Sequence, residues 1–339
     1  MMRVHKRPIL ATLAVLCAAQ GTTGCAGRFV APAVEQGYIR TADGVRLFYR
    51  KVGSGRPAVV IPGDLFLFDD FRRLAGAGRT IVFYDMRNRG RSDAVRDSTT
   101  LTIRQDVEDL ETVRRHFGFD RVQLIGYSYL GLMVVMHAMA YPERVERIVQ
   151  LAPVARKWDT EYPEHLTERG PVPGVDTARA RRMRELAQSG YRESHPKEFC
   201  ELAWSVSRYG LVGDPARADR LGGSRCDMPN EWPVNFARHL RHHFTSVQQT
   251  TVTREEVARV RAPVLTIHGT RDRNASYGGG RQWALELPNA RLLTVPGAAH
   301  QVWVDALDVV LGAVDTFLRG HWPAGAERVT VLDPRTASP

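Results

Sequence analysis

The sequence contains little lysine and little cysteine, and it has no long apolar run. Only four of its 47 basic residues are lysines, and the others are arginines scattered among acidic residues. No dense basic tract carries interleaved aromatic residues, so we expect no nucleic-acid partner in spite of the formal net charge of +10. We interpret the arginines as a solvated surface.

The lack of a long apolar run excludes a whole class of protein. No stretch reaches the about 18 apolar residues that a spanning helix needs, which argues against a polytopic membrane protein. With 43% hydrophobic and 25% charged residues, the chain has globular composition and is not disordered, collagen-like or coiled-coil. Its 339 residues correspond to two domains, or to one large α/β domain with an insertion.

Residues 1–27 have the pattern of a secretory signal peptide. Basic residues precede a mostly apolar stretch over 9–19, which is short for a spanning helix. The small residues that follow resemble a bacterial lipoprotein processing site with Cys25 as the lipidated residue, although Thr22 stands where that site usually has leucine. We expect an exported protein that is periplasmic, secreted or anchored to the membrane by lipid. The alternative is an N-terminal extension on a cytoplasmic enzyme.

The four cysteines are consistent with export. Cys17 and Cys25 fall within the signal segment, which leaves Cys200 and Cys226 in the folded body. An even pair in an oxidising compartment can form a disulfide, and the alternative is two buried free thiols. Two cysteines without a C-x-x-C spacing do not make a metal site, and we expect neither a metal nor a cofactor.

Apolar runs alternate with helical patterns along most of the chain. Asp-Gly between alternating apolar residues predicts a hairpin over 37–52. Predicted strands cover 57–61, 80–84, 122–125, 147–151, 263–268 and 291–295, and predicted helices cover 98–117, 132–140, 282–286 and 302–318. This alternation predicts a mostly parallel sheet with helices on both faces.

One segment interrupts that alternation. Residues 155–252 show short helical patterns and no strand, and they are too many for a connecting loop. We therefore expect an α/β core in two parts, 37–154 and 253–320, with a helical cap inserted at 155–252. Residues 321–339 are expected to form a C-terminal tail.

The stretch around Ser128 carries the most chemical information. A predicted strand runs into Gly126, and a helix begins just after Ser128, so the serine is exposed at the carboxyl edge of the sheet. This turn resembles the nucleophile turn of the α/β-hydrolase family, whose pattern is G-x-S-x-G. The resemblance implies Ser128 as nucleophile and the N–H of Tyr129 as an oxyanion donor. The chain departs from the pattern with Leu130 and has Gly131 one place later. The structural alternative is a serine that caps a helix.

A serine hydroxyl needs a base, and the family order is serine, acid, histidine. Asp272 and His300 each follow a predicted strand, so both should lie at the same sheet edge as Ser128. We expect His300 to act as general base and acid and Asp272 to orient its ring. His268 is expected to be structural, and Asp305 to face solvent.

A second oxyanion donor is expected from the loop after the strand at 57–61. Many family members have His-Gly there, whereas this chain has Pro62-Gly63-Asp64. By position the backbone N–H of Asp64 is the candidate, with that of Leu65 next. The Asp64 side chain is expected to lie in solvent or to pair with an arginine. Residues 84–93 resemble the family's D-x-R-G-x-G-x-S stretch and are expected to form a structural loop.

A serine nucleophile argues against haloalkane dehalogenases and epoxide hydrolases, which resemble this fold but use aspartate. The expected substrate is a small ester, an amide or a short peptide. The cap supplies aromatic residues for an apolar pocket, among them Trp204 and Trp232. Cap acids such as Glu201 and Glu231 resemble those with which the proline iminopeptidase branch binds a substrate amine, and the alternative is that they pair with arginines. An aminopeptidase, an acyltransferase and a non-catalytic binding module therefore remain alternatives to an esterase.

Overall fold

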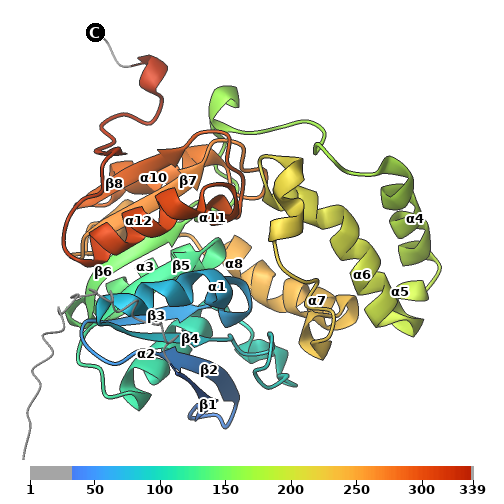
Figure 1. The fold of residues 1–339 in the computed structure, drawn as a ribbon, viewed down its shortest axis with the longest axis horizontal. Coiled ribbons are helices and arrows are strands. Elements are labelled where there is room, and N and C mark those ends of the chain that lie inside the picture. The colour runs from blue at the N-terminus through green and yellow to red at the C-terminus, as the bar shows by residue number, and fades with distance from the viewer. Residues whose placement is uncertain (1–32, 337–339) are drawn as a thin grey trace, which may run out of the picture. The chain divides into compact units, whose positions relative to one another are not determined.

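One mixed β-sheet runs through residues 33–336, the part of the chain that the computed structural model describes (Figure 1). Within that range its nine strands lie in the order β1-β2-β4-β3-β5-β6-β7-β8-β9. Neighbours are parallel from β4 to β8, and the outer pairs are antiparallel. The strands are β1 (Val34–Arg40), β2 (Arg46–Val52), β3 (Ala58–Pro62), β4 (Thr80–Tyr84), β5 (Val122–Tyr127), β6 (Val145–Leu151), β7 (Val264–Gly269), β8 (Ala290–Val295) and β9 (Ala326–Glu327). The expected signal peptide and the lipidation at Cys25 lie outside the described residues and stay predictions.

Side chains of the inner strands alternate between two buried faces. On β3, Val60 packs into one apolar cluster and Ile61 into the other, and Leu124 and Ile125 on β5 divide in the same way. Strands that are buried on both faces form continuous apolar runs in the sequence. This is why those runs predicted parallel strands correctly.

Helices cover both faces of the sheet. On one face lie α1 (Asp64–Phe71), α11 (Val302–Asp305) and α12 (Leu307–Leu318), and on the other lie α2 (Ile103–His116), α3 (Tyr129–Ala140) and α10 (Tyr277–Glu286). Each of these helices contributes apolar side chains to the cluster on its own face. The arrangement is the one that the alternation of strands and helices predicted.

The predicted helices were wrong at their boundaries. Those expected over 132–140 and 282–286 begin earlier, at Tyr129 and Tyr277. The helix expected over 98–117 begins at Ile103, because the side chain of Thr102 caps its N-terminus. The helix expected over 302–318 is interrupted at Ala306, whose φ of −145° and ψ of 60° are not helical. The apolar spacing continues across Thr102 and Ala306, and periodicity alone does not show a cap or a break.

The expected C-terminal tail contains one short strand that was not among the predicted strands. β9 pairs antiparallel with β8 and extends the sheet by one short strand. A strand of two residues is too short to produce an alternating apolar pattern, so the sequence gives no sign of it.

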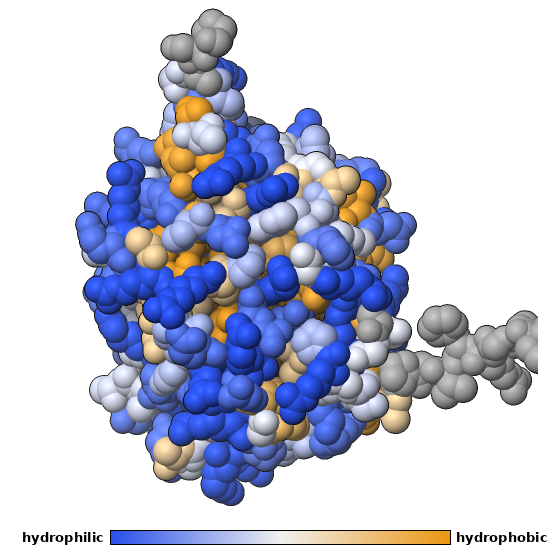
Figure 2. Space-filling model, turned by 90° about the vertical axis from the view of Figure 1, so that its left-hand side faces the viewer, coloured by the Kyte–Doolittle hydropathy of each residue, from blue (hydrophilic) through white to orange (hydrophobic). Residues whose placement is uncertain are grey.

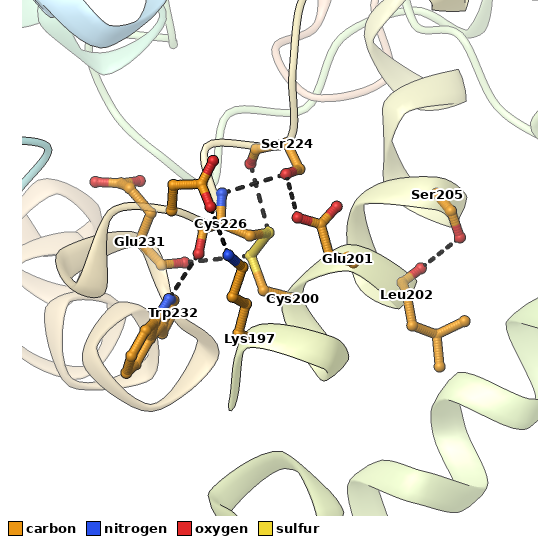
Figure 3. The surroundings of a disulfide bond; sticks show 10 residues. Lys197, Cys200, Glu201, Leu202, Ser205, Ser224, Cys226, Glu231 and Trp232 are labelled. Carbon is orange, nitrogen blue, oxygen red and sulfur yellow. Dashed lines mark hydrogen bonds and ion pairs between the residues drawn. A yellow bond between two sulfur atoms is a disulfide. The ribbon is translucent and has the colours of Figure 1, made fainter. Parts of the chain in front are cut away.

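Residues 155–252 fold mainly into helices, and an isolated antiparallel bridge between Lys157 and Thr251 joins the two ends of this insertion. Figure 1 shows its helices α4 to α7 to one side of the sheet. A disulfide bond connects Cys200 on α6 to Cys226 (Figure 3). The helices are α4 (Thr177–Gln188), α5 (Tyr191–Ser194), α6 (Pro196–Ser207), α7 (Pro233–His239) and α8 (Thr245–Gln249), and α9 (Arg254–Val257) follows.

The surface is largely hydrophilic, as the scattered arginine and acidic residues of the sequence predicted. Hydrophilic side chains cover most of the face drawn in Figure 2, with hydrophobic ones between them in separate groups. Among the helices at 33–336, none has both the length and the apolar character needed to cross a membrane.

The contact between β5 and α3 leads to a prediction for Gly126→Ala. A Cβ at this position would lie 2.2 Å from the carbonyl oxygen of Leu130, a backbone atom in the first turn of α3. We expect the free energy of unfolding, measured by urea denaturation, to fall by about 1–3 kcal/mol, as in overpacked cores.

Gly312→Ala is the matched control, because nothing lies within 4 Å of a Cβ built on this residue of α12. Alanine is a better helix former than glycine, so this variant should gain about 1 kcal/mol. Equal effects of the two substitutions would contradict the close approach at Gly126.

Candidate active site

Ser128 occupies a strained turn between β5 and α3. Its φ of 58° and ψ of −126° are rare for a residue with a side chain. The Ser128 N–H donates to the carbonyl of Leu151 at 2.9 Å, and its own carbonyl accepts from Gly131 at 2.9 Å. The close approach of α3 at Gly126 makes the turn tight. The surrounding structure therefore holds the hydroxyl at the carboxyl end of the parallel strands.

His300 follows β8 on a short loop that is fixed at several points. The N–H of Ala299 donates to the carboxylate of Asp305 at 2.8 Å, and the N–H of Gln301 donates to the carbonyl of Leu211 at 2.9 Å. Asp305 also accepts from the N–H of Gly213 in the insertion at 2.8 Å. The expectation that Asp305 faces solvent was wrong, because its carboxylate joins the histidine loop to the insertion.

Asp272 follows β7 and is fully enclosed. One carboxylate oxygen, Oδ1, accepts the N–H groups of Asn274 at 2.8 Å and Ala275 at 2.9 Å. The other, Oδ2, lies 2.7 Å from Nδ1 of His300 and 3.2 Å from Nε2 of His268. Asp272 is thus surrounded by donors, which is what keeps a buried carboxylate ionised.

The three side chains expected to act together do meet in a row. Nε2 of His300 lies 3.0 Å from Oγ of Ser128, and Nδ1 of His300 lies 2.7 Å from Asp272. These distances are within hydrogen-bond range for a nucleophile, a base and the group that orients the base.

His268 was expected to be structural, and the structure adds a contact to the acid. Its Nε2 lies 3.0 Å from the carbonyl of Ala275 and 3.2 Å from Asp272. A Cβ on Gly280 would lie 2.2 Å from its ring, so the imidazole is packed against α10. The strand-end position of His268 was visible in the sequence, but its contact with Asp272 was not.

Electrostatics favour the ionised form of Asp272. Burial on its own raises the pKa of this carboxyl, but the attraction of His300 and the hydrogen bonds from His268 and His300 outweigh burial. The result is a pKa held well below the usual range of aspartate. Asp272 is therefore a stable negative charge next to the imidazole.

The two backbone N–H groups expected as oxyanion donors each belong to the first residue of a helix. Tyr129 is the first residue of α3, and Asp64 is the first residue of α1. First-turn N–H groups have no partner within their own helix. A Cβ on Gly63 would lie 3.1 Å from the Leu130 side chain, so the turn before α1 packs against the start of α3.

The Asp64 side chain does not take part in the expected oxyanion hole, because it pairs with an arginine. Both of its oxygens accept from Arg50, at 2.8 and 2.6 Å, and Arg91 lies 3.6 Å away. The neighbouring N–H of Leu65 is already used, since it donates to Asp85 at 3.0 Å. The N–H of Asp64 therefore stays the candidate for the second oxyanion donor, as its position after β3 predicted.

The loop at 84–93 is structural at its centre, as expected, but one residue reaches the site. Asp85 is buried and accepts the N–H groups of Leu65 and Arg91. Burial and the nearby charge of Asp64 raise the pKa of Asp85 to about 7. Arg89 from the same loop lines the cavity above Ser128, a position that the structural interpretation of the loop did not include.

Two cavities that share part of their walls lie between the sheet edge and the insertion. The inner one, of about 200 Å³, contains Ser128 and His300, and the outer one has about 400 Å³. Together they are of the size of small-molecule sites, about 300–1,000 Å³. The residues common to both are Phe66, Arg89, Trp204, Arg225, Phe236 and Leu240.

The predicted cap residues are only partly confirmed as cavity residues. Trp204 lines both cavities, whereas Trp232 lines neither, because its Nε1 donates to the carbonyl of Cys226 at 2.8 Å. Glu201 is exposed and accepts from the hydroxyl of Ser224 (Figure 3).

Glu231 lines the outer cavity, but arginine pairing, the alternative interpretation, describes it better. Its oxygens accept from Arg89 at 2.9 and 2.8 Å and from the N–H of Gly90 at 2.8 Å. The pair is buried rather than on the surface, with the Glu231 side chain 9% exposed.

The other titratable residues do not gather into a metal site. No group of three or more potential ligands was found within residues 33–336. His243 of the insertion is buried, and its Nε2 lies 2.6 Å from Asp106. The ring of His239 stacks on it.

Comparison with known proteins identifies the family. A family model of the alpha/beta hydrolase fold matches residues 64–306, which is more than half of the chain. The chain belongs to the alpha/beta hydrolase fold family. The expected fold class is thereby confirmed, and with it the expectation of a hydrolase.

Relatives of this alpha/beta hydrolase include proline iminopeptidases. That of Xylella fastidiosa (strain 9a5c) is 29% identical over 311 residues, covering 84% of this chain and 96% of that enzyme. That of Saccharolobus solfataricus is 32% identical over 124 residues, covering 34% of this chain and 40% of that enzyme. The second match thus spans only two fifths of the relative's length.

Solved structures of other alpha/beta hydrolases share the fold at low sequence identity. A serine hydrolase from Cycloclasticus zankles has a TM-score of 0.64 at 15% identity, covering 85% of this chain and 99% of that one. An esterase from Exiguobacterium antarcticum has a TM-score of 0.63 at 14% identity, covering 84% of this chain and all of that one.

The low pKa of Asp272 leads to a prediction for Asp272→Asn. Asparagine keeps an oxygen for the two backbone N–H groups but has no charge. A carboxyl whose pKa is lower in the folded than in the unfolded chain stabilises the fold above its unfolded pKa of about 3.9, and this contribution is lost as the pH falls further. The wild type should therefore unfold at higher urea concentration than the variant at pH 7.

The difference in free energy of unfolding should shrink as the pH falls below about 4. Urea denaturation of both proteins at a series of pH values measures it. A difference that does not change with pH would contradict the assigned charge of Asp272.

Proposed function

We propose that this hydrolase cleaves an ester or amide bond through an acyl-enzyme formed on Ser128. The observation that supports the proposal most strongly is the hydrogen-bonded row of Ser128, His300 and Asp272 at the carboxyl edge of the sheet. In that row a base contacts the hydroxyl, and a buried carboxylate contacts the base.

The reaction begins with transfer of the Ser128 proton to Nε2 of His300 while Oγ attacks the substrate carbonyl carbon. The N–H groups of Tyr129 and Asp64 stabilise the negative oxygen that develops. Asp272 holds the ring with Nδ1 protonated and stabilises the imidazolium. The imidazolium then donates its proton to the leaving alcohol or amine, and the acyl group stays on Ser128.

Hydrolysis of the acyl-enzyme repeats these steps with water. His300 takes a proton from the water, whose oxygen attacks the acyl carbon, and then returns a proton to Ser128 as the acid product leaves. The neighbouring ring of Tyr127, with its centroid 4.8 Å from that of His300, packs the imidazole against the sheet edge.

A second candidate is an aminopeptidase, which the names of the proline iminopeptidase relatives favour. Such an enzyme binds a free amine, and a carboxylate is the usual partner of an amine. Glu231 is the acid among the described residues that line the two cavities, and Arg89 already pairs with it.

Parallel assays with a 4-nitrophenyl ester and with proline 4-nitroanilide separate the two candidates. We expect kcat/KM for the ester to exceed that for the anilide, because Arg89 occupies the carboxylate of Glu231. A preference for the anilide would favour the aminopeptidase.

Ser128→Ala tests the nucleophile. We expect kcat for the ester to fall by at least about 10³-fold, as when other triads lose a member, with little change in thermal unfolding. Covalent labelling by a fluorophosphonate should be lost at the same time.

Ser205→Ala is the matched control, since this hydroxyl on α6 donates to the carbonyl of Leu202 and lines neither cavity. It should keep both labelling and turnover. Labelling or ester cleavage that persists in Ser128→Ala would remove Ser128 from its proposed role.

A further inference from the structure

Arg225 is a charged residue in the wall of the active-site cavity that the proposed mechanism does not use. It lines both the inner cavity, with Ser128 and His300, and the outer one. Its φ of 61° is in the left-handed region, which is rare for a residue with a side chain. A conformation of this kind persists only where the surroundings hold it.

The guanidinium of Arg225 is fixed on one side and open on the other. Its Nε donates to the carbonyl of Leu65 at 2.5 Å, and its carbon Cζ lies 4.9 Å from the ring centre of Phe66 and 5.9 Å from that of Trp204. Within residues 33–336 no carboxylate lies within 4.0 Å of it, so it forms no ion pair there. The two terminal nitrogens keep their donors for another partner.

Three acids near Arg225 have hydrogen-bond partners of their own. Glu231 accepts from Arg89 and from Gly90, and Asp64 accepts from Arg50. Asp85 accepts two backbone N–H groups. The positive charge of Arg225 is therefore not neutralised by a direct contact with any of them.

The inner cavity offers no other charge that would offset Arg225. As described, its wall contains no Asp or Glu side chain. His239 in the same wall has a pKa well below its usual value, because burial and the nearby charge of Arg89 disfavour its protonation, so it adds no positive charge at pH 7. A largely buried arginine without a carboxylate partner costs free energy unless an anion binds it.

The residues before and after Arg225 are both held in place by contacts with other parts of the insertion. The next residue, Cys226, forms the disulfide to Cys200 on α6, and the carbonyl of Cys226 accepts from Trp232 (Figure 3). On the other side the hydroxyl of Ser224 donates to Glu201 at 2.7 Å. A guanidinium held in place before the substrate arrives loses little entropy on binding.

We propose that Arg225 binds a carboxylate of the substrate, so that the preferred substrate is a largely apolar ester or amide with a carboxylate close to the scissile bond. The proposal rests on the proposed hydrolysis at Ser128 and adds the substrate class. Arginine matches a carboxylate with two parallel N–H donors. The same charge repels a free ammonium group, which opposes the aminopeptidase alternative.

Two matched pairs of esters test the proposal, since the carboxylate can belong to the acyl or to the leaving group. Mono-4-nitrophenyl adipate is compared with its methyl ester, and 4-acetoxybenzoate with its methyl ester. Each pair differs in one negative charge, and rates without enzyme are subtracted. The wild type should prefer the anionic member of at least one pair in kcat/KM by about 10-fold.

Arg225→Gln should lower kcat/KM for that anionic ester by about 30-fold or more, the loss typical of a buried charge pair that loses one partner. The neutral ester should change less than about 3-fold. Arg225→Lys keeps the positive charge but cannot donate two parallel hydrogen bonds to a carboxylate. Its kcat/KM for the anionic ester should lie between those of the wild type and Arg225→Gln. It also provides a second variant if Arg225→Gln does not fold. A merely structural role of Arg225 would lower both members of the pair alike.

Arg217→Gln is the matched control, because it removes one positive charge from the insertion outside both cavities. Its ratio of anionic to neutral turnover should equal that of the wild type. An unchanged ratio in both Arg225 variants, or a wild type that prefers the neutral member of both pairs, would overturn the proposal.

Cleavage of the neutral esters distinguishes a failure of the proposed hydrolysis at Ser128 from a failure of the proposed role of Arg225. If the wild type cleaves them and Ser128→Ala does not, the hydrolase mechanism stands whatever Arg225 does, and an unchanged ratio then overturns the substrate class alone. If the wild type cleaves none of the four esters, the proposed hydrolysis and the substrate class fall together.

Discussion

The left-handed backbone of Ser128 is the constraint on which the rest of the site depends. A residue with a side chain adopts this conformation at a cost of about 1–3 kcal/mol, so the sheet and α3 must hold it. Gly126 permits the close approach of α3, and the carbonyl of Leu151 fixes the Ser128 N–H. The same turn directs Oγ toward His300 and begins α3, whose first N–H group, that of Tyr129, is the proposed oxyanion donor. The turn between β5 and α3 thus positions the nucleophile and also supplies a donor for the negative oxygen that develops in the reaction.

The insertion completes the site by electrostatics as much as by shape. Glu231 of the insertion and Arg89 of the core form a buried ion pair across the cavity wall, and Asp305 of the core accepts the N–H of Gly213. Neutralised pairs of this kind can enclose a substrate without leaving an unpaired charge against it. Arg225 differs, because it has no carboxylate partner within the described part of the chain. An unpaired charge in a wall whose other ion pairs are neutralised is where we expect a charged group of the ligand to bind. The disulfide at Cys226 stabilises that arrangement by holding the segment next to the arginine.

Features that depend on neighbouring residues could be predicted from the sequence, and features that depend on distant pairs could not. The apolar runs, the Asp-Gly hairpin and the strand–turn–helix at Ser128 each have a local cause, so the sheet and the order of the three site residues were visible. The bond from Arg89 to Glu231 joins residues 142 positions apart. No local pattern shows it, and the same holds for the contact of His268 with Asp272. The break at Ala306 was missed because the apolar spacing of the two short helices is continuous.

In the proposed mechanism the acyl group of the substrate becomes bonded to Oγ of Ser128. Rapid acid quenching during turnover of a 4-nitrophenyl ester, followed by proteolysis and mass spectrometry, measures where that group resides. We expect a mass increase of one acyl group on the peptide that contains Ser128, formed in step with a burst of nitrophenolate. Steady release of nitrophenolate with the acyl group on another residue, or on none, would contradict it.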